Sequence, residues 1–379
     1  MLSKEFIYDY ITGLNRPHFC KQKIVVFESD DWGMTRTMSK KSLERLKKSF
    51  PSNYINVYEE FDSLERNKDV SGLLDVLIKH KTPQGIRPNF TLNNIVANPN
   101  FTEIINSNFL NYHYEPFTET LSNYNDSSAV VQTCKEGVAE GVLSIEFHGR
   151  EHLNINRWMN SLVEGNSLLR KAVSEGHITH SDNYPPSGRR DYLDAFGFAY
   201  KSQFETEESI ISSGLDIFKR VWGFQPTSFI APCYTWHSNI EPYLFKNGIK
   251  FIQGNRVQRV PHKNETLEVK RTYNWHGKKH RSGLLSVTRS FDFEPVTAKN
   301  KLGYLQKKMF ELNNYLSSKM PVVISSHRVN YIGRISERNR DENLNLLDKF
   351  LAFIVETHPD VVFLSSAELA TRYLNKKHE

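Results

Sequence analysis

The sequence contains little cysteine and no long apolar run. Its three cysteines, Cys20, Cys134 and Cys233, lie far apart in a chain of 379 residues, so they predict neither a disulfide framework nor a cysteine-based zinc site. No uncharged apolar stretch approaches the roughly 20 residues that span a bilayer, and the first residues lack the continuous apolar segment of a signal peptide. We therefore expect a soluble, cytoplasmic protein without a membrane span.

A large excess of one charge is also missing. The 49 Lys and Arg residues against 43 Asp and Glu residues leave a net charge of +6, which does not indicate a nucleic-acid-binding protein. No repeat, low-complexity tract or Pro/Ser-rich linker separates a second domain. We expect one domain over residues 1–379, with residues 1–22 as an N-terminal extension. The sequence does not predict an oligomeric state.

Short β-branched or aromatic runs alternate with amphipathic stretches, which is typical of βα units around a parallel sheet. Helices are predicted over Thr206–Gly223 and Asn343–Thr357 and, from a capping box at Ser238, up to Gly248. The predicted strands are Ile24–Phe27, Pro88–Leu92, Val142–Phe147, Ile178–His180, Thr227–Ala231, Lys250–Ile252, Leu284–Val287, Val322–Ser325 and Val361–Leu364.

This alternation predicts an α/β fold, as a complete or incomplete (β/α) barrel of seven to eight parallel strands. In such barrels the active site lies at the C-terminal ends of the strands. Polar residues that follow a predicted strand are therefore candidates for function.

Two adjacent acids, Asp30 and Asp31, follow the first predicted strand. Neighbouring side chains diverge, so one carboxylate can bind a metal while the other faces a substrate. The alternative is a loop whose acids are solvated or cap the next helix.

Two histidines, His148 and His152, follow the strand Val142–Phe147. On a helical turn this spacing lets both imidazoles reach a single metal. With Asp31 they offer two histidines and one carboxylate, which leaves coordination positions for water and substrate. We expect a divalent metal as cofactor, with zinc as its identity; a chance histidine pair is the alternative.

Two later strand ends carry further candidates. His327 follows Val322–Ser325 and has a side chain suited to proton donation, although a hydrogen-bonded bystander is the alternative. Pro232 follows Thr227–Ala231, where it rigidifies a turn whose next amides can face an oxyanion. Trp236 is a candidate for stacking on a sugar ring or for the core, and we interpret Arg328 and Pro232 as substrate-binding residues.

These four strand ends, in this order, resemble the signature of the polysaccharide deacetylase family, also called NodB-homology or carbohydrate esterase family four domains. The resemblance spans roughly Lys23 to Leu369. It implies that Asp30 is the catalytic base and that Asp31, His148 and His152 are the metal ligands. It also implies that the amide of Tyr234, after Pro232, contributes to an oxyanion hole and that His327 is the general acid.

The sequence departs from the family pattern at several positions. Gly149 replaces the hydroxyl residue that usually follows the first metal histidine, and Ile230 or Ala231 stands where many members carry an arginine. Asp292 is the candidate for the partner of His327.

The activity that the resemblance implies is hydrolysis of an N-acetyl group from a sugar or glycan. Two alternatives stay open, namely a non-catalytic carbohydrate-binding pseudoenzyme on the same barrel and another metal-dependent hydrolase.

The segment Asn255–Arg281 is rich in basic residues. Its cations are Arg256, Arg259, Lys263, Lys270, Arg271, Lys278, Lys279 and Arg281, against the acids Glu265 and Glu268. One interpretation is a solvated hairpin whose charges aid solubility. The other is a surface beside the active site that attracts an anionic substrate.

Overall fold

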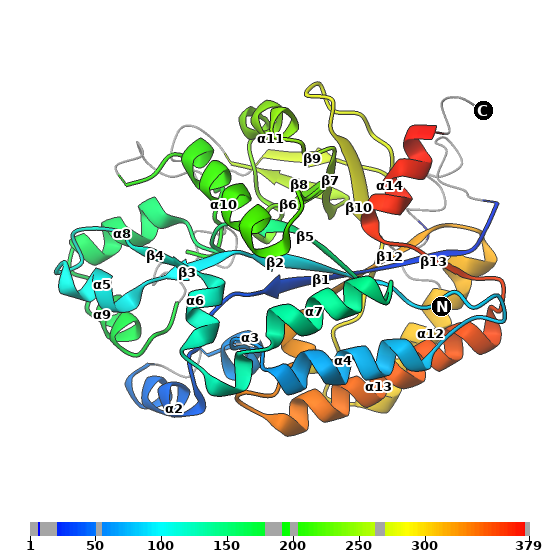
Figure 1. The fold of residues 1–379 in the computed structure, drawn as a ribbon, viewed down its shortest axis with the longest axis horizontal. Coiled ribbons are helices and arrows are strands. Elements are labelled where there is room, and N and C mark those ends of the chain that lie inside the picture. The colour runs from blue at the N-terminus through cyan, green and yellow to red at the C-terminus, as the bar shows by residue number, and fades with distance from the viewer. Residues whose placement is uncertain are drawn as a thin grey trace.

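A computed structural model describes residue 7 and residues 21–50, 55–178, 192–197, 204–261 and 270–375. Its main sheet has the strand order β10-β7-β6-β5-β2-β1-β12-β11, with β13 added beside β1 (Figure 1). The predicted extension over residues 1–22 lies almost wholly outside the described residues, and its prediction, like that of a single domain, stays a prediction.

Nine strands form this sheet within the described residues, and each of their pairings is parallel. They are β1 (Ile24–Trp32), β2 (Phe90–Ile95), β5 (Leu143–Gly149), β6 (Ser228–Ile230), β7 (Phe251–Asn255), β10 (Leu285–Arg289), β11 (Phe291–Asp292), β12 (Val322–His327) and β13 (Val362–Phe363).

One stretch of chain closes the sheet on itself. Only Ser290 separates β10 from β11. Because β10 pairs with β7 and β11 pairs with β12, this stretch joins the two ends of the strand order. The predicted α/β barrel of seven to eight parallel strands is confirmed: with β10 and β11 counted as one interrupted strand, eight parallel strands form a nearly closed barrel.

Helices pack around the sheet (Figure 1). In the described ranges the α-helices are α2 (Lys40–Ser49), α3 (Val57–Phe61), α4 (Asn67–Lys79), α5 (Phe101–Asn106), α6 (Phe117–Ser122), α7 (Val130–Ala139), α8 (Ile155–Val163), α9 (Ser167–Ser174), α10 (Glu207–Trp222), α11 (Glu241–Lys246), α12 (Lys301–Ser317), α13 (Glu337–Thr357) and α14 (Ser366–Asn375). Two short antiparallel pairs join β3 (Ala97–Pro99) to β4 (Tyr114–Pro116) and β8 (Val257–Val260) to β9 (Lys270–Tyr273). Of the helices in these ranges, none has the length and apolar character that crossing a membrane requires.

The element predictions are confirmed unevenly. Helix α10 has the predicted bounds, because Thr206 caps its first turn and Gly223 ends it in the left-handed conformation at φ 84°. The predicted strand Ile178–His180 is wrong at Ile178, which lies in no strand, while residues 179–180 lie outside the described part. The predicted capping box at Ser238 is also wrong, because Ser238 lies inside a 3-10 turn that His237 caps.

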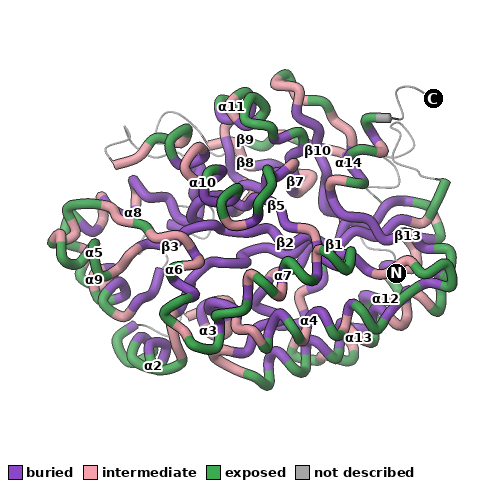
Figure 2. Tube along the Cα trace, viewed as in Figure 1, coloured by how far each residue is buried: buried purple, intermediate pink, exposed green. Residues whose placement is uncertain are grey.

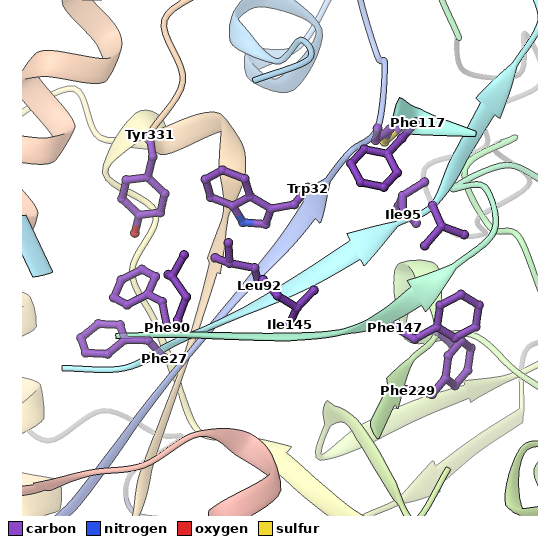
Figure 3. Packing of buried hydrophobic residues seen from close by; sticks show 14 of the residues in the cluster. Phe27, Trp32, Phe90, Leu92, Ile95, Phe117, Ile145, Phe147, Phe229 and Tyr331 are labelled. Carbon is purple, nitrogen blue, oxygen red and sulfur yellow. The ribbon is translucent and has the colours of Figure 1, made fainter. Parts of the chain in front are cut away.

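The barrel interior changes character along β1. Side chains of a strand alternate between its two faces, so Val25 and Phe27 face the outer helices, where Phe27 stacks on Phe90 at 4.5 Å between ring centroids (Figure 3). Ile24 and Val26 belong instead to the interior cluster. The same alternation places Glu28 and Asp30 inside the barrel. The strands of the main sheet are largely buried while the outer faces of the helices are exposed (Figure 2), so charged groups collect inside one end of the barrel, shielded from solvent.

Candidate metal and catalytic site

The end of β1 separates two adjacent carboxylates. Its pairing with β2 is irregular between Ser29 and Trp32, and Asp31 adopts a left-handed backbone at φ 73°. Aspartate tolerates this region better than most residues, and bulges re-aim side chains beside active sites. Gly33 completes the turn, since a Cβ at that position would lie 2.3 Å from the carbonyl oxygen of Ile95. The side chains of Asp30 and Asp31 consequently contact different groups.

Asp31, His148 and His152 meet at one point. Their ligand atoms lie within 4.8 Å of one another, with Asp31 Oδ1 3.4 Å from Nε2 of His148 and 3.6 Å from Nε2 of His152. All three side chains are buried. Asp31 Oδ1 and His148 Nε2 have no hydrogen-bond partner among the described residues, which is rare for buried polar atoms. The donor set fits a divalent cation.

The two histidines converge by a bend of the chain. Residues 149–152 are not helical, so the expectation of a shared helical turn is wrong. Gly149 has φ 116°, a conformation that other residues rarely adopt. His148 donates through Nδ1 to the carbonyl oxygen of Ile230 at 2.9 Å, which leaves Nε2 as the ligand atom. Burial lowers the pKa of His152 to about 3, so its imidazole is neutral, as a metal ligand must be.

Asp30 is held by cationic and amide donors inside the barrel. Arg289 donates to both carboxylate oxygens at 2.7 Å, and Asn93 Nδ2 donates at 2.8 Å. Burial works to raise the pKa of Asp30, but the Arg289 guanidinium holds it below the usual range. Asp30 is therefore ionised and fixed in orientation.

His327 lies beside Asp30. The two residues are partners in the pairing of β1 with β12, and His327 Nε2 is 3.9 Å from Asp30 Oδ2. Its Nδ1 bonds to Glu294 Oε1 at 2.5 Å. Burial opposes the charged form, but Glu294 and the two aspartates raise the pKa of His327 to about 9. The imidazole is protonated at neutral pH, and its side chain is 23% exposed.

An ionic network of buried residues contacts Asp31 through Arg36. Arg36 Nη2 is 3.4 Å from Asp31 Oδ2, and Arg36 Nε bonds to Asp62 at 3.2 Å. Arg328, next to His327 in the chain, bonds to Asp62 at 2.9 Å and to Glu65 at 2.7 Å. Through Arg328, Asp62 and Arg36, the network connects the chain next to His327 with Asp31.

Several predicted site residues are buried or hydrogen-bonded within the protein. Arg328 and Trp236 are buried, and Trp236 donates to Glu241 at 3.1 Å. Their contact with substrate stays a prediction. Pro232 is buried at the start of a 3-10 turn. The Tyr234 amide donates within that turn to the carbonyl oxygen of Ala231 at 2.9 Å, so it is engaged elsewhere than at an oxyanion.

Sequence reasoning missed the charged partners of the site. Arg289 ends β10, so the rule that polar strand ends are candidates applies to it as well. Asp292, the candidate for the partner of His327, bonds to Lys308 at 2.7 Å instead. The partner is Glu294, two residues further on. Asn93 and Arg36 gave no comparable signal in the sequence.

The basic segment begins at the end of the barrel where the site lies and runs back to the other end, because Lys279 bridges to Leu285 at the start of β10. It leaves the C-terminal end of β7, and Trp236 N donates to the carbonyl oxygen of Arg259 in β8 at 3.2 Å. Lys263, Glu265 and Glu268 lie outside the described residues. The location that the anion-attracting interpretation requires is therefore present.

No family model matches the sequence, and no curated protein matches it. Matching solved structures include an allantoinase (12% identity, TM-score 0.48, covering 96% of this chain and 94% of that one). A probable polysaccharide deacetylase from Pseudomonas aeruginosa PAO1 has 12% identity and a TM-score of 0.47, covering 94% and 92%. A 4-alpha-glucanotransferase from Thermococcus litoralis has 8% identity and a TM-score of 0.44, and 93% of this chain spans only 40% of that one. Polysaccharide deacetylases are thus among the similar structures, but at these TM-scores we base no conclusion on the likeness.

Proposed function

We propose that this protein is a metal-dependent hydrolase that removes an N-acetyl or related acyl group from a sugar. The observation that carries the proposal is the convergence of Asp31, His148 and His152 beside an ionised carboxylate and a protonated imidazole. A site with open ligand positions and a separate base and acid suits hydrolysis of an amide.

The metal ligands would be Asp31, His148 and His152. A divalent metal held there, with zinc as our expectation, would act as a Lewis acid and would lower the pKa of water from about 15.7 to roughly 7. Asp30 accepts a proton from the attacking water, since Arg289 and Asn93 keep its carboxylate ionised and oriented. As the carbon–nitrogen bond breaks, His327 donates the proton on Nε2 to the departing amine. Glu294 holds the other ring nitrogen and so orients the imidazole.

The test combines metal analysis with acetate release. We expect about one zinc per chain and release of acetate from at least one class among free, nucleotide-linked and lipid-linked N-acetyl sugars. Asp30→Asn should keep the metal and lose the release. Metal binding without release from any of these sugars would favour the non-catalytic carbohydrate-binding barrel, and release from non-sugar amides alone would favour another metal-dependent hydrolase.

A further inference from the structure

Tyr58 is an aromatic residue at the site to which the proposed mechanism assigns no role. It lies in α3, which a capping box anchors, because the Asn56 side chain accepts from the Glu59 amide and the Glu59 side chain accepts from the Asn56 amide. The buried Glu59 carboxylate also lies 3.4 Å from Arg36. This short helix is therefore fastened to the ionic network behind Asp31.

The ring of Tyr58 contacts both His327 and Arg36. Its edge meets the ring of His327, with centroids 5.4 Å apart and an interplanar angle of 77°. On another side the Arg36 guanidinium lies 5.6 Å from its centroid, and the same guanidinium is 3.4 Å from Asp31. Tyr58 thus contacts the general-acid candidate and a direct neighbour of the metal-ligand candidate.

Tyr58 is half-buried, and its hydroxyl group bonds to no described residue, so it is free to donate to a bound group. Burial, together with the negative charges of Glu294 and Asp31, raises the pKa of Tyr58 well above its ordinary value. The phenol therefore keeps its proton at neutral pH. It can donate a hydrogen bond to a bound group.

The donor expected from the sequence is occupied. The Tyr234 amide donates to Ala231, and the Tyr234 hydroxyl accepts from Arg289 at 2.8 Å. We propose that the Tyr58 hydroxyl donates a hydrogen bond to the acyl oxygen of the substrate, and that this bond strengthens as negative charge develops there. The inference rests on the proposed function and makes Tyr58 a catalytic residue of the same reaction.

Tyr58→Phe tests this directly, because it keeps the ring contacts with His327 and Arg36 and removes only the hydroxyl. The probe is acetohydroxamate, which presents an acyl oxygen, titrated into zinc-loaded protein by calorimetry. We expect the dissociation constant to rise about 5- to 10-fold, with zinc content unchanged. With an acetamido sugar that the wild type cleaves, kcat should fall roughly 10- to 100-fold with little change in KM.

The control is Tyr243→Phe in α11, which should bind acetohydroxamate like the wild type. Equal binding by wild type and Tyr58→Phe would overturn the role of the hydroxyl and leave the proposed function standing. A weakened Tyr58→Leu beside an unaffected Tyr58→Phe would assign the effect to ring packing, which also overturns it. Wild-type protein that binds neither zinc nor acetohydroxamate would overturn both proposals.

Discussion

The metal half and the proton-transfer half of the candidate site are built in opposite ways. Asp31 and His148 meet at atoms that lack hydrogen-bond partners among the described residues, whereas Asp30 and His327 are each held by a charged partner, Arg289 and Glu294. A buried polar group without a partner costs about 1–3 kcal/mol. A cation bound between Asp31 and the two histidines would satisfy the unpartnered atoms of the metal half, whereas the carboxylate of Asp30 and the imidazole of His327 already have charged partners within the protein.

The comparison predicts its largest effect at Arg289. Arg289→Met leaves the carboxylates of Glu28 and Asp30 buried without their cation. Breaking a buried ion pair by removing one partner costs about 3–5 kcal/mol, so we expect a loss of that size in the free energy of unfolding, measured with urea. Arg338→Met, at an exposed pair on α13, is the control and should change stability little. A variant at Arg289 as stable as the control would contradict the comparison.

The metal half should respond to zinc instead. Zinc at 100 times its dissociation constant should stabilise the wild type by about 2.7 kcal/mol, measured as the shift in thermal unfolding. Asp31→Asn should lose this stabilisation together with the bound zinc, because it removes the ligand carboxylate.

The matched control for Asp31→Asn is its neighbour, since Asp30→Asn changes the same group one residue away and should keep the zinc response. Loss of zinc from both variants would show that the two carboxylates do not have separate roles. Retention of zinc by both would remove Asp31 from the ligand set.

A smaller effect is expected at Glu294, on pH dependence. The pKa of His327 is raised to about 9, so the stability it contributes is present below its ordinary value near 6.5 and is lost as pH rises through about 9. Activity that needs the protonated ring falls over the same range, and a bound cation shifts that fall to lower pH. Glu294→Gln removes a negative charge that raises the pKa of His327, so it should move the alkaline limb of the kcat/KM profile to still lower pH.

Asp292→Asn is the control for this pH profile, because Asp292 bonds to Lys308 and not to His327. Its alkaline limb should coincide with that of the wild type. A limb that moves with Asp292 and not with Glu294 would restore the sequence-based assignment of the histidine partner.

The same comparison explains what could be predicted from sequence. The metal half consists of residues at the ends of two strands, and a local motif marks each end. Asp31, His148 and His152 could therefore be predicted from the sequence. The way in which the two histidines converge could not be predicted, because the bend at Gly149 depends on a backbone conformation that the spacing of the histidines does not specify.

The proton-transfer half depends on which strand ends meet. Arg289 reaches Asp30 because β10 and β11 close the barrel between β7 and β12, and Glu294 reaches His327 from the turn after β11. Strand order and closure are properties of the whole fold. Patterns within single segments therefore identify the strands and the barrel class but not these partners.

The smallest effect is expected at the basic hairpin that follows β7. Neutralising Arg256, Arg259 and Arg271 together to Gln should raise KM for an anionic acetamido sugar about 2- to 5-fold at low salt, since charges in contact with solvent contribute little and are screened. A neutral acetamido sugar should be unaffected, and the difference should shrink as salt is added. The control neutralises Lys219, Arg220 and Lys246, which lie in the last turns of α10 and α11 before β6 and β7 and thus at the opposite end of the barrel. Equal changes for both sugars, or the same change in the control, would return the hairpin to the role of a solvated surface.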